Sequence, residues 1–209
     1  MQIAIVLYPG FTALDVIGPY DVLGRLPDTE VVFVAERPGL VRNDLGSLSI
    51  DVVAGLADVP NPDVVIVGGG AGQAEQMADG RLHAWLRTVD RTSAWTASVC
   101  TGTLILAAAG VLEGRRATTH WGALEHLAGF GVTPAKERVV IDGHYATGAG
   151  VSAGIDMALT LAGLMAGDDV AQALQLLIEY APEPPYTSGS PNSAPADVVE
   201  KLFTLFPPS

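Results

Sequence analysis

The sequence predicts an α/β fold in which a mostly parallel sheet is covered by helices on both faces. Short apolar runs of strand length alternate with longer segments that carry apolar residues at helical spacing, which is typical of strand–helix–strand units. Two of the runs, Ile3–Tyr8 and Asp63–Val67, are almost wholly apolar, as expected of strands buried on both faces. The 209 residues are 49% hydrophobic, which is enough for one domain with a sizeable core.

The first third of the chain holds two core strands, a helix and a small β excursion. Thr12–Leu26 has apolar residues at helical spacing, and Pro19 should kink or interrupt that helix. The excursion returns through Ser49–Val53, and turn residues flank it. In order, the predicted strands and turns of this region are Ile3–Tyr8, Pro9-Gly10, Val31–Ala35, Pro38-Gly39 and Asp44–Gly46.

The middle and last thirds continue the alternation. The strand Asp63–Val67 runs directly into the glycine run Gly68–Gly72, and the strand Trp95–Val99 ends at Cys100. A hairpin is predicted around Asp142-Gly143. The other predicted elements are a helix over Gln73–Thr92 that breaks at Gly80, helices over Thr103–Ala109, Gly122–Ala128, Ala153–Met165, Val170–Tyr180 and Ala196–Phe206, a short strand at Thr118-Thr119, and the hairpin strands Val139–Ile141 and Tyr145–Thr147.

The C-terminal segment differs in composition from the rest. Pro182–Pro195 contains five prolines together with Ser, Thr and Gly, which predicts an extended arm. No internal repeat and no second domain are apparent. We therefore expect a single domain over residues 1–209, with a proline-rich C-terminal arm from about residue 182.

Charge, hydropathy and cysteine content exclude several functional classes. The net charge of −12 opposes binding to phosphate backbones, so no nucleic-acid partner is expected. Mean hydropathy is high at +0.35, but no run of about 18 uncharged apolar residues predicts a membrane span. The chain opens without a signal-peptide pattern, which predicts a cytoplasmic protein. With one cysteine and four histidines outside ligand spacing, neither an internal disulfide nor a metal site is expected.

Three predicted strand ends carry unusual chemistry. In parallel sheets, sites lie at the carboxyl ends of the strands. Tyr8–Asp15, Gly68–Gly72 and Val99–Gly102 all follow core strands directly. We therefore expect these three segments to form any site that the protein has.

Cys100 stands between an apolar strand and a helix, where a sharp turn would hold its side chain out of the sheet. The helix N-terminus would favour the thiolate and lower the pKa of the thiol. The backbone N–H of Thr101 would point to where an oxyanion develops. The alternative interpretation is a small buried core cysteine, and the residues by themselves leave both open.

The glycine run and Asp15 also have two interpretations each. Gly68–Gly72 could aim backbone N–H groups at a reacting oxygen, or could be a plain tight turn, and it matches neither a Walker loop nor a dinucleotide fingerprint. Asp15 could be the N3 residue of a helix capped by Thr12. It could instead be a carboxyl that lies beside Cys100, is pushed toward its protonated form and donates a proton.

The histidines give weaker signals. His120 lies between a strand and a helix and could reach the pocket, or could be a capping or surface histidine. His83 and His126 fall on amphipathic helices, so both are expected to be exposed to solvent.

Taken in order, these residues resemble the ThiJ/PfpI superfamily, a flavodoxin-like three-layer fold related to class I glutamine amidotransferases. The resemblance runs from Met1 to about Pro191 and is strongest to the isonitrile hydratase subgroup. The segments that carry it are Leu14–Leu23, Gly69–Gly72, Ser98–Gly102, Gly114–Trp121, Glu137–Val140, Thr147–Asp156 and Glu179–Pro182.

The resemblance implies roles for four residues. Cys100 would be the nucleophile, and Asp15 its acidic partner, where many relatives have Glu. Gly70 matches the position that supplies a backbone oxyanion donor. Thr101 stands where peptidases and amidases of the superfamily commonly have His, which argues against a protease. The family is typically dimeric and uses no cofactor, so a homodimer without a cofactor is expected.

Three functions from different classes follow. The first is hydration of an isonitrile, a small-molecule substrate, to an N-substituted formamide by Cys100 and Asp15. The second is a glyoxalase- or deglycase-like cysteine enzyme with His120 as base. The third is a non-catalytic ligand-sensing domain like those of AraC-type regulators. The short proline-rich end of the chain and its charge oppose a DNA-reading helix pair.

Overall fold

A computed structural model describes residues 1–206, and its centre is one seven-stranded sheet. The strands are β1 (Gln2–Val6), β2 (Glu30–Ala35), β5 (Ala54–Gly55), β6 (Val64–Val67), β7 (Trp95–Val99), β10 (Val139–Asp142) and β11 (Tyr145–Gly148). Their order across the sheet is β10-β11-β7-β6-β1-β2-β5. Within it β10 pairs antiparallel with β11, and the other neighbours pair in parallel.

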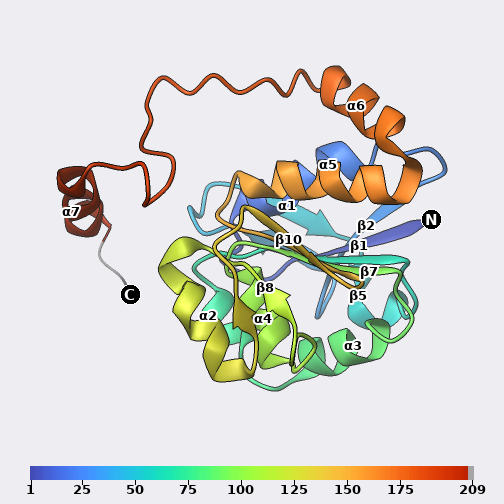
Figure 1. The fold of residues 1–209 in the computed structure, drawn as a ribbon. Helices are drawn as coiled ribbons and strands as arrows, with labels where there is room; N and C mark the ends of the chain where they lie inside the picture. The colour runs from blue at the N-terminus through green and yellow to red at the C-terminus, as the bar shows by residue number, and fades with distance from the viewer. Residues whose placement is uncertain (207–209) are drawn as a thin grey trace. The chain divides into compact units, whose positions relative to one another are not determined.

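Helices cover both faces of the sheet, which confirms the predicted three-layer α/β arrangement (Figure 1). On one face lie α1 (Ala13–Leu23), α5 (Ala153–Ala166) and α6 (Asp168–Leu177). On the other lie α2 (Gln73–Gln76), α3 (Arg81–Val89), α4 (Gly102–Ala108) and the 3₁₀ helix η2 (Trp121–Phe130). The helix predicted over Gln73–Thr92 thus breaks near Gly80, as expected.

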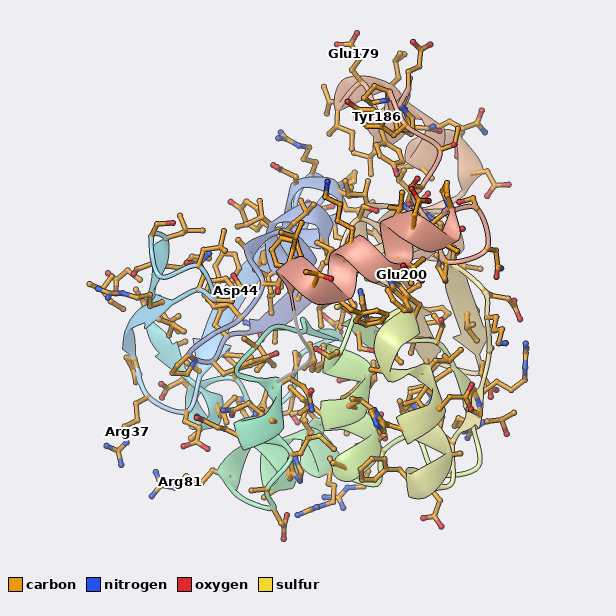
Figure 2. All side chains as sticks on the ribbon, turned by 90° about the vertical axis from the view of Figure 1, so that its left-hand side faces the viewer. Arg37, Asp44, Arg81, Glu179, Tyr186 and Glu200 are labelled. Atoms are coloured by element: carbon orange, nitrogen blue, oxygen red, sulfur yellow. The ribbon has the colours of Figure 1, made fainter. Side chains whose placement is uncertain are left out.

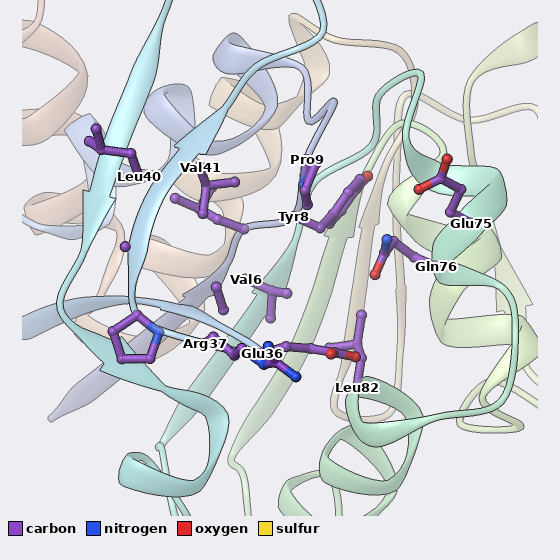
Figure 3. A pocket seen from close by; sticks show the side chains of 14 residues that line it. Val6, Tyr8, Pro9, Glu36, Arg37, Leu40, Val41, Glu75, Gln76 and Leu82 are labelled. Carbon is purple, nitrogen blue, oxygen red and sulfur yellow. The ribbon is translucent and has the colours of Figure 1, made fainter.

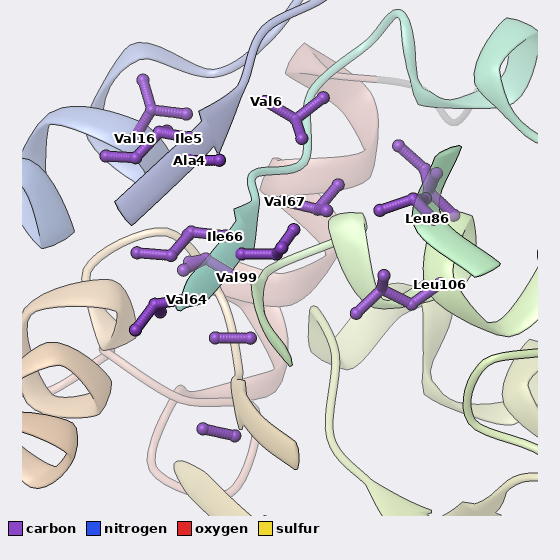
Figure 4. Close-up of a cluster of buried hydrophobic side chains, with 14 of the residues drawn as sticks. Ala4, Ile5, Val6, Val16, Val64, Ile66, Val67, Leu86, Val99 and Leu106 are labelled. Carbon is purple, nitrogen blue, oxygen red and sulfur yellow. The ribbon is translucent and has the colours of Figure 1, made fainter. Parts of the chain in front are cut away.

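The core lies between these layers, and its strands are buried because their side chains are apolar on both faces. Every residue of β6 is buried. Val16 of α1 covers the sheet from one side, while Leu86 of α3 and Leu106 of α4 cover it from the other (Figure 4). This two-sided burial explains the high mean hydropathy without a membrane span. None of the helices in residues 1–206 has the length and apolar character needed to cross a bilayer.

The predicted β excursion is an antiparallel hairpin of β3 (Gly39–Arg42) and β4 (Ser49–Val52). It is fixed to the segment that follows β1. The N–H of Gly10 donates to the carbonyl of Arg42 at 2.9 Å, and the N–H of Asp44 donates to the carbonyl of Phe11 at 2.9 Å. The hairpin therefore holds Asp44 beside the start of α1.

Pro19 lies inside α1 without interrupting it. The residue before a proline is usually forced out of helical geometry by contact with its Cβ, but here that residue is Gly18. A Cβ at Gly18 would lie 3.1 Å from Cγ1 of Ile155 in α5. Gly18 therefore both avoids the clash with Pro19 and allows α1 to pack closely against α5.

The segment before η2 also differs from the prediction. The short strand is β8 (Arg116–Ala117), which pairs with β9 (Thr133–Pro134), and not Thr118-Thr119. The two threonines make hydrogen bonds to other parts of the chain and not to a neighbouring strand of a short sheet. The N–H of Thr118 donates to Oγ1 of Thr147 at 2.9 Å, and the hydroxyl of Thr119 donates to the carbonyl of Cys100 at 2.7 Å. The predicted helix over Gly122–Ala128 falls within η2 and is of the 3₁₀ type.

The chain divides into two compact units, Met1–Ile178 and the part from Glu179 onward. The first contains the whole sheet, the hairpin and the 3₁₀ turn η1 (Leu56–Asp58). The second contains α7 (Ala196–Leu205).

Charged side chains such as Arg37 and Arg81 project outward from the first unit (Figure 2), whereas the carboxyl of Asp15 is fully buried within it.

Candidate active site

The three strand ends that the sequence singled out meet at one edge of the sheet. β1, β6 and β7 are adjacent and parallel, so their carboxyl ends lie together. Oδ2 of Asp15 accepts the N–H of Gly69 at 2.8 Å. The N–H of Gly70 donates to Oγ1 of Thr101 at 3.2 Å. The structure thus joins the segment after β1 to the glycine run, and the glycine run to the cysteine turn.

Cys100 adopts a left-handed backbone conformation, with φ of +56°. Such a conformation costs about 1–3 kcal/mol for a residue with a side chain and persists only where the surroundings hold it. Here the N–H of Cys100 donates to the carbonyls of Gly148 at 3.0 Å and Ala149 at 2.7 Å. The predicted sharp turn is therefore confirmed. Cys100 is only 6% exposed, so its side chain is buried, as in the alternative interpretation.

The pKa of the Cys100 thiol is raised to about 12, which is opposite to the direction expected from the sequence. Burial is the main cause, and the negative charge of Asp15 adds to it. The N–H groups of Thr101 and Val151 and the hydroxyl of Thr101 lower the pKa by hydrogen bonding, but they are outweighed. A helix N-terminus contributes typically about 0.3–1 kcal/mol, which is less than the cost of ionising a buried thiol.

The Asp15 carboxyl is also held away from its ordinary ionisation. Burial raises its pKa to about 7, and the charge of Asp44 acts in the same direction. The hydrogen bond from Gly69 and the thiol of Cys100 lower it in part. Its Oδ1 is buried and has no hydrogen-bond partner within residues 1–206. Asp15 therefore has an unused acceptor atom inside the site.

Thr12 is the N-cap residue of α1 and Asp15 its N3 residue, as the capping interpretation expects. The side chain of Thr12, however, makes no capping hydrogen bond. Instead its hydroxyl donates to Asp44 at 2.6 Å, and its backbone N–H donates to the carbonyl of Gly69 at 2.8 Å. Asp15 is thus directed at the glycine run and Cys100, and not back at the helix start.

Asp15 and Cys100 influence each other's ionisation, because the charge of Asp15 raises the pKa of the Cys100 thiol. A thiolate and a carboxylate in the same buried pocket repel each other, so the pair loses its protons in two separate steps. Because the pKa of Asp15 is raised to about 7 and that of Cys100 to about 12, the carboxyl loses its proton before the thiol does. Such a pair can pass a proton to a substrate and take one back.

The glycine run is required by close packing around the pair. A Cβ on Gly69 would lie 2.5 Å from both N and Oγ1 of Thr101 and 3.1 Å from Oδ2 of Asp15. Gly70 has φ of +141°, which a residue with a side chain rarely adopts. The N–H of Gly70 donates to the hydroxyl oxygen of Thr101, and that hydroxyl in turn hydrogen-bonds Cys100. Gly70 is therefore connected to Cys100 through Thr101.

Three further residues touch the site, and the sequence did not assign them individually. The buried hydroxyl of Tyr8 donates to the carbonyl of Gly68 at 2.8 Å, and its pKa is raised well above 10 by burial and by the charges of Asp15 and Cys100. The hydroxyl of Thr119 and the N–H of Val151 also reach Cys100. Backbone and hydroxyl donors leave no pattern in the sequence, although Tyr8 does stand at a strand end.

The histidines make no hydrogen bond to Cys100 or Asp15 within residues 1–206. His120 is partly buried, and its Nδ1 accepts the N–H of Gly122 at 3.3 Å. Burial lowers its pKa. His83 is buried, with Nε2 2.8 Å from the carbonyl oxygen of Gln76, so its predicted exposure is wrong. His126 is exposed, as expected.

A cavity of about 490 Å³ lies next to Tyr8 (Figure 3). Its lining combines apolar side chains such as Leu82 with the charged side chains of Glu36, Arg37 and Glu75, and it includes neither Cys100 nor Asp15. Tyr8 is common to the cavity and to the surroundings of the reacting pair.

Across residues 1–206, no three His, Cys, Asp or Glu side chains gather in a way that could hold a metal ion.

Comparisons with known proteins agree with this geometry. The isonitrile hydratase of Pseudomonas putida is 44% identical over 209 residues, which cover 100% of this chain and 91% of the relative. The crystal structure of a ThiJ/PfpI family protein from Pseudomonas syringae superposes with a TM-score of 0.94 at 37% identity, covering 98% of this chain and 85% of that one, which confirms the flavodoxin-like fold.

Other relatives match only in part. The transcriptional regulator CdhR of Pseudomonas aeruginosa is 40% identical over 94 residues, which are 43% of this chain and 27% of the regulator. The family model for DJ-1/PfpI proteins matches residues 1–163. The chain belongs to the DJ-1/PfpI family.

Proposed function

We propose that this protein is an isonitrile hydratase, a hydro-lyase that converts R–N≡C and water into an N-substituted formamide. The observation that carries the proposal is the burial of the Asp15 carboxyl and the Cys100 thiol where the adjacent strands β1, β6 and β7 end, with Asp15 held by the N–H of Gly69. The reaction needs a nucleophile for the isonitrile carbon and a group that moves protons to and from the adduct. Identity of 44% to the isonitrile hydratase of Pseudomonas putida supports the same reaction.

In the first step the Cys100 sulfur bonds to the terminal carbon of the isonitrile. The thiol proton passes to the Asp15 carboxylate as the S–C bond forms, and Asp15 delivers that proton to the same carbon. The product is the thioimidate R–N=CH–S–Cys, and Asp15 is again ionised. Because the pKa of Asp15 is about 7, it can both take and return this proton near neutral pH.

In the second step Asp15 takes a proton from water, whose oxygen attacks the thioimidate carbon. The nitrogen gains the proton, and a tetrahedral adduct R–NH–CH(OH)–S–Cys forms. When the C–S bond breaks, the hydroxyl proton returns through Asp15 to the sulfur. The formamide R–NH–CHO leaves, and the Cys100 thiol is restored.

Thr101 and Gly70 serve in this scheme as donors to the adduct. The N–H of Gly70 donates to the hydroxyl oxygen of Thr101, which leaves the hydroxyl hydrogen free to point at the sulfur. The Thr101 N–H adds a backbone donor. Donors fixed in advance stabilise charge that develops on the intermediate.

The glyoxalase- or deglycase-like alternative has less support, because it needs His120 as a base at the nucleophile. The ring of His120 instead accepts the N–H of Gly122. The ligand-sensing alternative draws on the match to CdhR, which covers less than half of this chain. We also propose, from the family resemblance, that the enzyme is a homodimer, and we retain the expectation from the sequence that it is cytoplasmic. Exposed apolar side chains such as Leu45 and Val53 on the hairpin are consistent with an interface.

The test follows the loss of a simple alkyl isonitrile and the appearance of its formamide. Wild type should turn over, Cys100→Ser should not, and Asp15→Asn should lose about 10²–10⁴-fold in rate, the usual contribution of a positioned proton-transfer group. Asp15→Glu should recover part of the activity. Wild-type turnover no greater than that of Cys100→Ser would overturn the proposal, and lactate formed from methylglyoxal would favour the glyoxalase alternative.

A further inference from the structure

Thr119 holds the strained turn through the carbonyl oxygen of Cys100. Its hydroxyl donates to the carbonyl oxygen of Cys100 at 2.7 Å, and the residue is only 1% exposed. The same carbonyl accepts one further hydrogen bond, from the N–H of Thr103, at the longer distance of 3.3 Å. The Thr119 hydroxyl is therefore the closer of the two donors to this carbonyl.

The two sides of Cys100 are fixed by segments that are distant in sequence. Its N–H is bound by the carbonyls of Gly148 and Ala149 at the end of β11, and its carbonyl by Thr119 after β8. Thr118 anchors the second segment, because its N–H donates to Oγ1 of Thr147 in β11. A residue at φ of +56° relaxes unless such contacts oppose it.

We propose that Thr119 is a positioning residue, whose hydroxyl keeps the Cys100 turn in its left-handed conformation and so keeps the sulfur in line with Asp15. The sequence pointed to the neighbouring His120 as the functional residue of this segment, whereas the geometry points to Thr119. The inference deepens the proposed hydratase function, but the state of the Cys100 thiol provides a readout that does not depend on it.

The main variant is Thr119→Val, which keeps the shape of the side chain and removes the hydroxyl. Relaxation of the turn should move the sulfur away from Asp15, so kcat for an alkyl isonitrile should fall about 10–100-fold with KM within about 3-fold, as expected for misplacement of a reacting atom by about 1 Å. At the same time iodoacetamide should alkylate Cys100 faster at pH 8, because the sulfur leaves the buried, negatively charged pocket that raises its pKa.

Two further variants separate positioning from general stability. Thr119→Ser keeps the hydroxyl and should restore most of kcat and the wild-type alkylation profile. Thr96→Val removes an equally buried threonine hydroxyl, which donates to Asp90 at 2.8 Å from the opposite end of β7, and should change neither readout. If Thr119→Val does not fold, Thr119→Ala replaces it with the same expectations.

The outcomes distinguish this inference from the proposed function. If wild type lacks hydratase activity, the proposed function fails, but the alkylation profiles of the four proteins still test Thr119. Wild-type alkylation and, where turnover exists, wild-type kcat in folded Thr119→Val would overturn the positioning role. Equal effects in Thr96→Val would also overturn it.

Discussion

Asp15 is buried and forms no ion pair with a cationic side chain within residues 1–206, so the stability of the fold should depend on pH. Its pKa is about 7 in the folded protein and about 3.9 in an unfolded chain. The folded protein therefore binds this proton more tightly. The resulting stabilisation is complete below pH of about 4 and is lost as the pH rises through about 7.

Asp15→Asn should consequently stabilise the fold at high pH while it removes activity. At pH 8 we expect its free energy of unfolding to exceed that of wild type by about 1–3 kcal/mol, and the difference should shrink at pH 5. Urea unfolding at both pH values measures this. The control is Asp51→Asn, the same change at an exposed carboxyl of β4. A capping role would instead make Asp15→Asn less stable at pH 8.

Cys100 is the other half of the pair, and its ionisation can be followed directly because the chain has no other cysteine. With a pKa of about 12, the wild-type thiol should be alkylated slowly near pH 8, and the rate should keep rising with pH. In Asp15→Asn the repelling carboxylate is gone, so alkylation at pH 9 should be faster although hydratase activity is lower. A wild-type plateau at or below pH 8.5 would contradict the raised pKa.

At the scale of elements, the β3–β4 hairpin brings a charge to the site. Asp44 in its turn accepts the hydroxyl of Thr12 at 2.6 Å and raises the pKa of Asp15. Asp44 is exposed, so salt should screen its effect. Burial is the main cause of the raised pKa of Asp15, and the hairpin raises this pKa further through Asp44.

Asp44→Asn should shift the low-pH limb of the activity profile to lower pH, because it removes a negative charge and keeps an oxygen acceptor for Thr12. The profile of kcat/KM against pH reports this limb for the free enzyme. High salt should shift the wild-type limb in the same direction, and Asp51→Asn should leave it in place. If neither Asp44→Asn nor high salt moves the low-pH limb, the charge of the hairpin does not affect the ionisation of Asp15.

At the scale of the whole molecule, the sheet, the core and the candidate site all belong to the unit Met1–Ile178. A chain that ends at Ile178 should therefore fold, with a thermal midpoint by circular dichroism within a few degrees of the full chain, and should retain a Cys100 alkylation profile like that of wild type. If the truncated chain is unfolded, the segment from Glu179 onward contributes to the stability of the domain and the prediction is wrong.

Much of this architecture could be predicted from local sequence. Apolar runs such as Val64–Val67 identify core strands because burial on both faces demands them. Parallel strands place their carboxyl ends together, so the sequence alone allowed the segments containing Asp15, Gly69 and Cys100 to be assigned to one site. The resemblance of the motifs to a known family then gave these residues their expected roles.

Tertiary structure alone decided the rest. Only the folded chain shows that α1 continues through Pro19 and packs closely against α5 at Gly18. The short strand lies at β8 because Thr118 and Thr119 make their hydrogen bonds to Thr147 and Cys100. The pKa of Cys100 depended on burial and on a carboxylate 85 positions away in the chain. Strand periodicity is a local property that sequence displays, whereas desolvation and charge coupling are set by distances that exist only after the chain has folded.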